Sequence, residues 1–146
     1  MHKQNNSIDS LFISVAKLHY SRAQDLFNKL GLHRGQPPIL FVLWEQDGRT
    51  QREISERLMS TPATVTVILQ RMEKSGFIIR KPDRHDLRVS RVYLTDKGKE
   101  IRSAVEDTLK DLEAQTFANF NTEELALIRR FFIQIKENLL KPGGTA

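Results

Sequence analysis

The chain has 146 residues, 39% of them hydrophobic, and carries a formal net charge of +5. This length and apolar content are typical of one domain with its own hydrophobic core. The absence of Cys excludes disulfides, cysteine-ligated zinc and thiol redox sensing, and the lack of a signal peptide or a membrane-spanning apolar run predicts a cytoplasmic protein without a membrane partner.

The first predicted element is a long helix over residues 8–30. Its apolar residues recur at steps of three and four, the period of a helix with one buried face. Gly31 follows them, as glycine commonly does at a helix end. The helix packs either on the core of its own chain alone or also against a second chain. The stripe consists of Ile8, Leu11, Phe12, Val15, Leu18, His19, Leu26 and Leu30.

A loop over residues 32–38, which contains two prolines, leads to a short apolar helix over residues 39–46. The dipeptide after this helix, Asp47-Gly48, is typical of a turn. Trp44 is the only tryptophan and is better explained as a core anchor than as a ligand platform.

Two short helices joined by a tight turn come next. Thr50 caps the first, over residues 51–59, with a Glu three positions later as in a capping box. Thr61 caps the second, over residues 62–75, whose first position holds a Pro that has no N–H to satisfy. Inward-facing apolar residues in the second helix leave one face for contact, formed by Ala63, Thr64, Thr66, Val67, Gln70 and Arg71.

A basic β-hairpin follows the two helices. Residues 77–80 and 89–94 have the composition and alternation of two antiparallel strands, and the loop between them is polar. A helix-turn-helix followed by such a hairpin is the arrangement of a winged helix, which reads DNA.

Two long helices complete the chain. Thr95 caps a helix over residues 96–120, and its apolar residues again follow the helical period. Asn121, with Glu124 three positions later, begins the last helix, which ends before Pro142.

The net charge is confined to the predicted helix-turn-helix and hairpin. Residues 49–91 contain ten Arg or Lys and five Asp or Glu, whereas the rest of the chain contains 13 of each sign. A solvated basic face is the simplest explanation of such a cluster. Because this one coincides with a DNA-reading pattern, double-stranded DNA is favoured as the partner over a membrane surface or an acidic protein.

Together these elements predict a mostly α fold with a small β wing (α+β), a winged helix-turn-helix. We expect a single domain over residues 1–146, with a DNA-binding lobe over residues 39–98. Long dimerisation helices over residues 8–30 and 99–140 flank the lobe. Few residues remain to cover the apolar faces of these helices within one subunit, so we expect a homodimer with two-fold symmetry.

The second helix of the helix-turn-helix, residues 62–75, is expected to enter the major groove. Thr64 and Val67 are the best candidates for base contacts, since a hydroxyl can bond several bases and a methyl can pack on thymine. Gln70 can pair with adenine. Phosphate contacts are expected from Thr61, Thr66 and Arg71.

The wing, residues 80–91, is expected at the minor groove, where narrow A-tracts attract an Arg. Arg88 is the first candidate, with Asp86 two residues before it to fix its direction. Arg84 is the second candidate. Strand positions of the wing supply expected phosphate contacts, namely Arg80, Lys81 and Arg91.

The wing also resembles that of a known family. Residues 83–88, DRHDLR, and residues 92–98, VYLTDKG, are similar to the wing motif of the multiple-antibiotic-resistance regulator (MarR) family of bacterial transcription factors. The recognition-helix stretch TPATVT and the later RMEKSG resemble that family as well, and so does the segment over residues 31–37. One position departs from the motif. The first Arg of the family's wing motif would fall at position 85, where this chain has His85, and the nearest Arg is one position earlier, at Arg84.

The resemblance implies a homodimer on a pseudo-palindromic operator, usually a repressor, located with the bacterial nucleoid when bound. It also implies release by a small aromatic or anionic effector. Polar-tipped or aromatic groups near the expected effector site are His19, Tyr20, His33 and Trp44, each better explained by ordinary packing. Neither a metal nor a cofactor is expected.

Three other functions are alternatives to sequence-specific DNA binding. A winged helix can serve protein–protein contacts, although such modules often lack a basic recognition face. A nonspecific architectural DNA-binding protein is the second possibility. An enzyme is disfavoured because the sequence has no clustered His, no Gly-rich phosphate loop and no G-x-S-x-G. Sequence does not distinguish an activator from a repressor.

Overall fold

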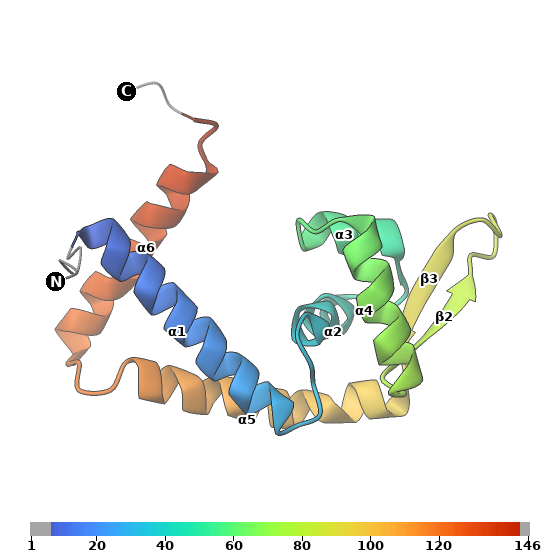
Figure 1. Ribbon diagram of the computed structural model, residues 1–146, viewed down its shortest axis with the longest axis horizontal. Helices are drawn as coiled ribbons and strands as arrows, with labels where there is room; N and C mark the ends of the chain where they lie inside the picture. The colour runs from blue at the N-terminus through green and yellow to red at the C-terminus, as the bar shows by residue number, and fades with distance from the viewer. Residues whose placement is uncertain (1–6, 144–146) are drawn as a thin grey trace, which may run out of the picture. The chain divides into compact units, whose positions relative to one another are not determined.

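The computed structural model describes residues 7–143; residues 1–6 and 144–146, at the ends of the expected single domain, lie outside the described part. Nine elements follow one another in this part (Figure 1), and the expected fold class, helical with a small antiparallel sheet in a winged helix-turn-helix, is confirmed. They are α1 (Ile8–Asn28), α2 (Gln36–Glu45), β1 (Arg49–Thr50), α3 (Gln51–Arg57), α4 (Pro62–Lys74), β2 (Ile78–Pro82), β3 (Ser90–Leu94), α5 (Asp96–Thr116) and α6 (Thr122–Leu140).

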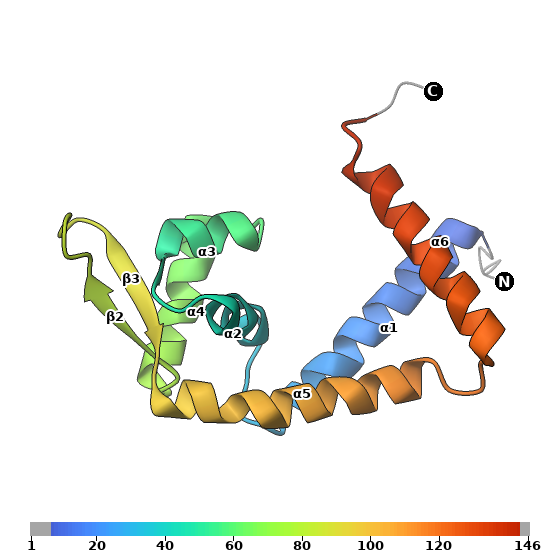
Figure 2. The ribbon, with the colours of Figure 1, turned by 180° about the vertical axis from the view of Figure 1, so that it is seen from behind.

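The chain divides into two compact units between Lys110 and Asp111, within α5. The first unit contains α1 to α4, the sheet and most of α5. The second contains the end of α5 and α6. The helix-turn-helix and the hairpin therefore belong to one unit (Figure 2).

The core of the first unit is formed by apolar side chains from α1 to α4, the loop between α1 and α2, the sheet and α5. Burial of each large side chain contributes about 1.5–3 kcal/mol relative to exposure. This core fixes α4 and the base of the β2–β3 hairpin to one scaffold. Its fully buried members include Leu32, Ile39, Leu40, Leu43, Ile54, Leu69, Met72, Phe77, Ile78, Val92 and Val105.

Three predicted helix caps are confirmed, those at Thr50, Thr61 and Asn121. The side chains of Thr50 and Thr61 accept hydrogen bonds from backbone N–H groups three positions on, and Glu53 completes the capping box at Thr50. Asn121 forms a second capping box with Glu124. A cap of this kind stabilises a helix by about 1 kcal/mol, so local sequence determines where these helices begin.

The predicted loop over residues 32–38 is wrong at its C-terminal end. Helix α2 begins at Gln36, so Pro37 and Pro38 lie in its first turn. A proline is tolerated there because the first N–H groups of a helix have no intrahelical acceptor. Gly35 precedes the helix with a φ of 84°, a conformation that favours glycine.

The predicted hairpin is present, but it belongs to a three-stranded sheet of order β1-β3-β2. Both pairings are antiparallel, and Val92 in the central strand lies opposite Arg49 on one side and Arg80 on the other. Strand β1 was not predicted because two residues are too few to show alternation. Strand β2 also extends to Pro82, two residues beyond its predicted end.

Three helices end at least two residues earlier than predicted, and the first is α1, which ends at Asn28 rather than at residue 30. Helix α3 ends at Arg57 rather than at residue 59, because Met59 adopts a φ of 49°. Helix α5 ends at Thr116 rather than at residue 120, and Asn119 has a φ of 67° in the turn that follows. Left-handed backbone at a residue cannot continue a right-handed helix.

Candidate nucleic-acid interface

Helix α4 has one buried face and one exposed face. Val65, Leu69 and Met72 are buried at steps of four and three, which directs the opposite face outward. Side chains on that face belong to the residues predicted to contact bases and phosphates. Those exposed are Thr61, Ala63, Thr64, Val67, Gln70 and Arg71, and Thr66 is half-buried.

The three threonine hydroxyls of this helix differ in what they already bind. Thr61 accepts from the backbone N–H of Thr64 at 3.2 Å and donates to the Thr64 hydroxyl at 2.8 Å. Thr66 donates to the carbonyl oxygen of Pro62 at 2.9 Å and lies 3.3 Å from the amide nitrogen of Gln51. The hydroxyl hydrogens of Thr61 and Thr66 are therefore already donated within the protein, whereas that of Thr64 is available for an acceptor on a bound molecule.

The wing loop is organised by one carboxylate. Asp83 Oδ2 accepts from the backbone N–H groups of His85 and Asp86, each at 3.0 Å. Arg91 donates from Nε to Asp83 Oδ1 at 2.5 Å and from Nη1 to the carbonyl oxygen of Gly48 at 2.9 Å. The hydrogen bond from Arg91, followed by those from the two backbone N–H groups, lowers the pKa of Asp83 to about 2. Arg91 thus links the wing loop, through Asp83, to the turn before β1, through Gly48.

The wing tip presents cations to solvent. Arg88 Nε lies 3.2 Å from Asp86 Oδ1, so the predicted hydrogen bond between these side chains is present. The Arg88 side chain is nevertheless 92% exposed. Arg84 is also exposed and makes no ion pair among the residues that the structure describes. Between them stands Leu87, which is 80% exposed.

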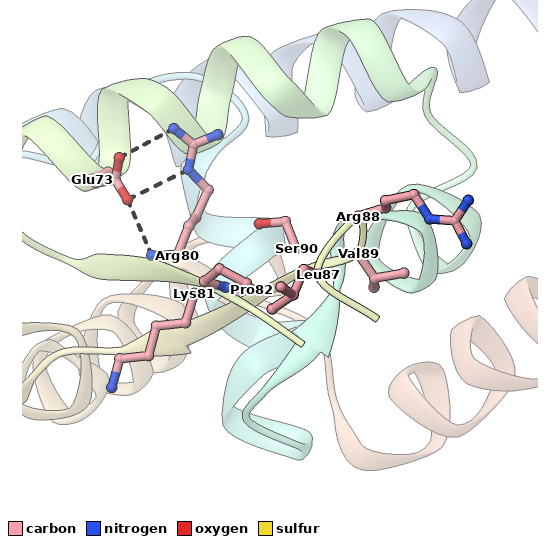
Figure 3. Close-up of a pocket in the computed structure, with 8 residues that line it drawn as sticks. All are labelled: Glu73, Arg80, Lys81, Pro82, Leu87, Arg88, Val89 and Ser90. Atoms are coloured by element: carbon pink, nitrogen blue, oxygen red, sulfur yellow. Dashed lines mark hydrogen bonds and ion pairs between the residues drawn. The ribbon is translucent and has the colours of Figure 1, made fainter. Parts of the chain in front are cut away.

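Arg80 lies at the base of the wing and faces α4. Its guanidinium and its backbone N–H both bind Glu73, whereas the head groups of Lys81 and Arg88 extend away from this pair (Figure 3). The hydrogen bond from the Arg80 side chain is the main reason why the pKa of Glu73 is lowered. An open groove of about 300 Å³ lies here, lined by Glu73, Arg80, Lys81, Pro82, Leu87, Arg88, Val89 and Ser90.

The four residues predicted near an effector site lie on three different segments. His19 and Tyr20 are exposed on α1, where the Arg34 guanidinium lies 5.7 Å from the Tyr20 ring centroid. His33 is exposed between α1 and α2. Trp44 is half-buried in α2 and donates from its indole nitrogen to the carbonyl oxygen of Gly98 at 2.9 Å.

Sequence reasoning missed three residues that hold the interface. Glu73 and Asp83 bind the arginines Arg80 and Arg91, and Lys97 donates from Nζ to the carbonyl oxygen of Ser75 at 2.7 Å. These partners are 7, 8 and 22 positions apart. None of these spacings is a neighbour distance on a helix or strand. Only the packed fold brings the partners together.

Over residues 7–143, no helix is long and apolar enough to cross a lipid bilayer. In the same part of the chain, no three His, Asp or Glu side chains form a group that could hold a metal ion.

Comparison with known sequences finds a family model that matches part of the chain. Residues 23–90 match the model of the MarR family. The transcriptional regulator TtmR of Methylorubrum extorquens (strain PA1) is 40% identical over 68 residues, a match that covers 47% of this chain and only 35% of TtmR. The organic hydroperoxide resistance transcriptional regulator of Bacillus subtilis (strain 168) is 29% identical over 105 residues, which cover 72% of this chain and 71% of that regulator.

Solved structures share the fold. A MarR protein from Peptoclostridium difficile superimposes with a TM-score of 0.79 at 23% identity, covering 95% of this chain and 91% of that one. A structure of reduced AbfR bound to DNA has a TM-score of 0.70 at 24% identity and covers 87% of this chain and 85% of AbfR. The family model matches the helix-turn-helix and most of the wing, and the fold along the chain is that of solved MarR proteins, so this chain is similar to the MarR family of transcriptional regulators.

Proposed function

We propose that the chain binds double-stranded DNA as a homodimer on a pseudo-palindromic operator, with α4 in the major groove and the wing at the minor groove. One observation carries this proposal. The exposed face of α4 and the 92% exposed Arg88 belong to the same compact unit. The similarity to AbfR, whose structure was solved with DNA, supports it.

Each side chain on the exposed face has a part in the proposed complex. Thr64, with its available hydroxyl hydrogen, and Val67 contact base edges, and Gln70 pairs with adenine. Arg88 enters the minor groove, with Arg84 beside it as the second candidate. The remaining expected contacts are to phosphates, and Thr61, Thr66, Arg71 and Lys81 are the residues that supply them.

A homodimer is proposed because both terminal helices carry uncovered apolar side chains. Helix α6 has no buried residue within Thr122–Leu140. On α1, Ile8 and Leu18 are among several large apolar side chains that are more than half exposed. Apolar surface of this extent marks an interaction site, and most soluble oligomers use closed symmetry. On α6 the exposed side chains are Leu125, Leu127, Phe131, Phe132, Ile133, Ile135, Leu139 and Leu140.

Repression, and release by a small aromatic or anionic effector, are inferred from the family. To bind two half-sites, the two recognition helices of the dimer must lie about one helical turn of DNA apart. An effector that binds more tightly to a dimer with a different spacing lowers the affinity for DNA by the ratio of its affinities for the two forms of the dimer. His19, Tyr20, His33 and Trp44 are the proposed effector contacts. The chain is further proposed to act in the bacterial cytoplasm, at the nucleoid, and to catalyse no reaction.

Selection of bound duplexes from a random pool tests the proposed function. We expect recovery of a palindrome whose half-sites are about 10 bp apart, one helical turn. If random DNA competes as well as the recovered duplex, the protein is a nonspecific architectural DNA-binding protein. If no duplex is retained at low salt, DNA binding is wrong and a protein partner becomes the better explanation.

A further inference from the structure

Arg80 is held by Glu73 through three hydrogen bonds. Glu73 Oε2 accepts from the backbone N–H of Arg80 at 3.1 Å and from its Nε at 3.4 Å. Glu73 Oε1 accepts from Nη2 at 3.1 Å. Both carboxylate oxygens and two guanidinium nitrogens take part, which is the fork geometry that only arginine provides.

The pair joins two elements that are both predicted to contact DNA. Glu73 lies in the last turn of α4, and Arg80 is the third residue of β2. Two positions earlier in the strand, on the same side, Ile78 is buried in the core. The wing is therefore fixed to the rest of the first unit at two points. One is the apolar contact at Ile78, and the other, roughly 7 Å further along the strand, is the ion pair.

The geometry also argues against a phosphate contact by Arg80. Its side chain is 25% exposed, and that of Glu73 is 39% exposed. A phosphate at this guanidinium would lie next to the Glu73 carboxylate, and the two negative charges would repel each other. Lys81 differs, since its side chain is exposed and has no carboxylate partner among the described residues.

We propose that Arg80 is a positioning residue, which with Glu73 braces the wing against the recognition helix and does not itself bind phosphate. This inference rests on the proposed DNA binding. Simultaneous contact in two grooves needs a fixed distance between α4 and the wing tip. A wing without the brace has to be ordered when DNA binds, and that loss of conformational freedom weakens the complex.

Glu73→Gln gives the sharpest test because two explanations predict opposite signs. Loss of a negative charge beside DNA strengthens binding if only charge matters. Loss of the brace weakens it. We expect Glu73→Gln and Arg80→Met each to bind the selected duplex roughly tenfold more weakly, within the range of measured couplings between paired residues. Arg80→Lys should recover little of this loss, since a lysine lacks the fork.

Salt dependence separates a brace from a phosphate contact. Loss of one phosphate contact lowers the slope of log affinity against log salt by about 1. We expect the Arg80→Met slope to equal that of the wild type. Lys81→Met is the matched control at the next position, and its slope should fall by about 2, about 1 for each protomer of the proposed homodimer.

Amide hydrogen exchange in the free protein is a readout that needs no DNA. Glu73→Gln should speed exchange over residues 78–94 and leave the core helices unchanged, whereas Lys81→Met should not. If no duplex binds the wild type, the proposed function fails, and exchange still decides whether the pair braces the wing. The inference is overturned if Glu73→Gln binds DNA more tightly than the wild type or if the salt slope of Arg80→Met is reduced. It is also overturned if exchange over residues 78–94 is unchanged in Glu73→Gln.

Discussion

The indole nitrogen of Trp44 donates a hydrogen bond to the carbonyl oxygen of Gly98, 2.9 Å away and 54 positions later in the chain. At the same residue, a Cβ atom would lie 2.2 Å from the carbonyl oxygen of Phe77. The first turn of α5 therefore lies directly against α2 and against the turn that follows α4. Lys97, the residue before Gly98, donates from Nζ to the carbonyl oxygen of Ser75.

Gly98→Ala should destabilise the protein by about 1–3 kcal/mol, because the new methyl group meets a backbone oxygen that cannot move aside cheaply. Urea unfolding measures this change. Gly143→Ala is the matched control, since a Cβ there has no neighbour within 4 Å. Equal unfolding free energies for the two variants would show that the turn does not pack as described.

Met59→Gly should stabilise the protein by up to about 1 kcal/mol. Met59 adopts a φ of 49° in the turn between α3 and α4, and it is 95% exposed. Its side chain therefore contributes little packing, while its Cβ strains the left-handed backbone. Met59→Ala keeps the Cβ and should leave the unfolding free energy within about 0.5 kcal/mol of the wild type. A glycine variant less stable than the alanine variant contradicts this explanation.

Asp83 should make stability depend on pH in acid. Its pKa is about 2 in the folded protein, below the ordinary value of 3.8. A carboxyl group with a lowered pKa stabilises the fold above its unfolded pKa, and this stabilisation is lost as pH falls towards the folded pKa. Asp83→Asn should therefore be less stable than the wild type at neutral pH, and the difference should shrink between pH 3.8 and about 2. Urea titrations across this range check it; a constant difference would contradict the role of the carboxylate.

Arg88→Ala and Val67→Ala should affect DNA binding in different ways. Loss of Arg88 should weaken binding to all duplexes. Loss of Val67 should change base preference at one position of each half-site, by about 1–3 kcal/mol. Binding to a panel of single-base variants of the selected duplex measures both. Unchanged affinity for Arg88→Ala would show that the wing assignment is wrong.

The parts of the fold that were predicted correctly depend on local sequence. Thr50, Thr61 and Asn121 each bind backbone groups within three residues, so a capping residue and its spacing are enough to place a helix start. The buried face of α4 follows from a period of 3.6 residues. Asp86 and Arg88 are two positions apart, and their pairing was predicted for the same reason.

The parts that were missed depend on contacts between distant segments. Strand β1 exists because Arg49 lies opposite Val92, 43 positions later. Arg80 and Arg91 were both predicted to contact phosphates, yet each binds a carboxylate that no local pattern pairs with it. A count of basic residues registers charge, whereas the fold decides which charges are already neutralised.

Equilibrium binding of the whole chain to its selected duplex, measured between 50 and 200 mM salt, tests DNA recognition most directly. A dimer that neutralises roughly 6–10 phosphates should lose about 10³–10⁵ in affinity across this range. A scrambled duplex of the same length should bind more weakly throughout. An affinity for the selected duplex that stays flat with salt would contradict DNA binding by the basic recognition helix and wing.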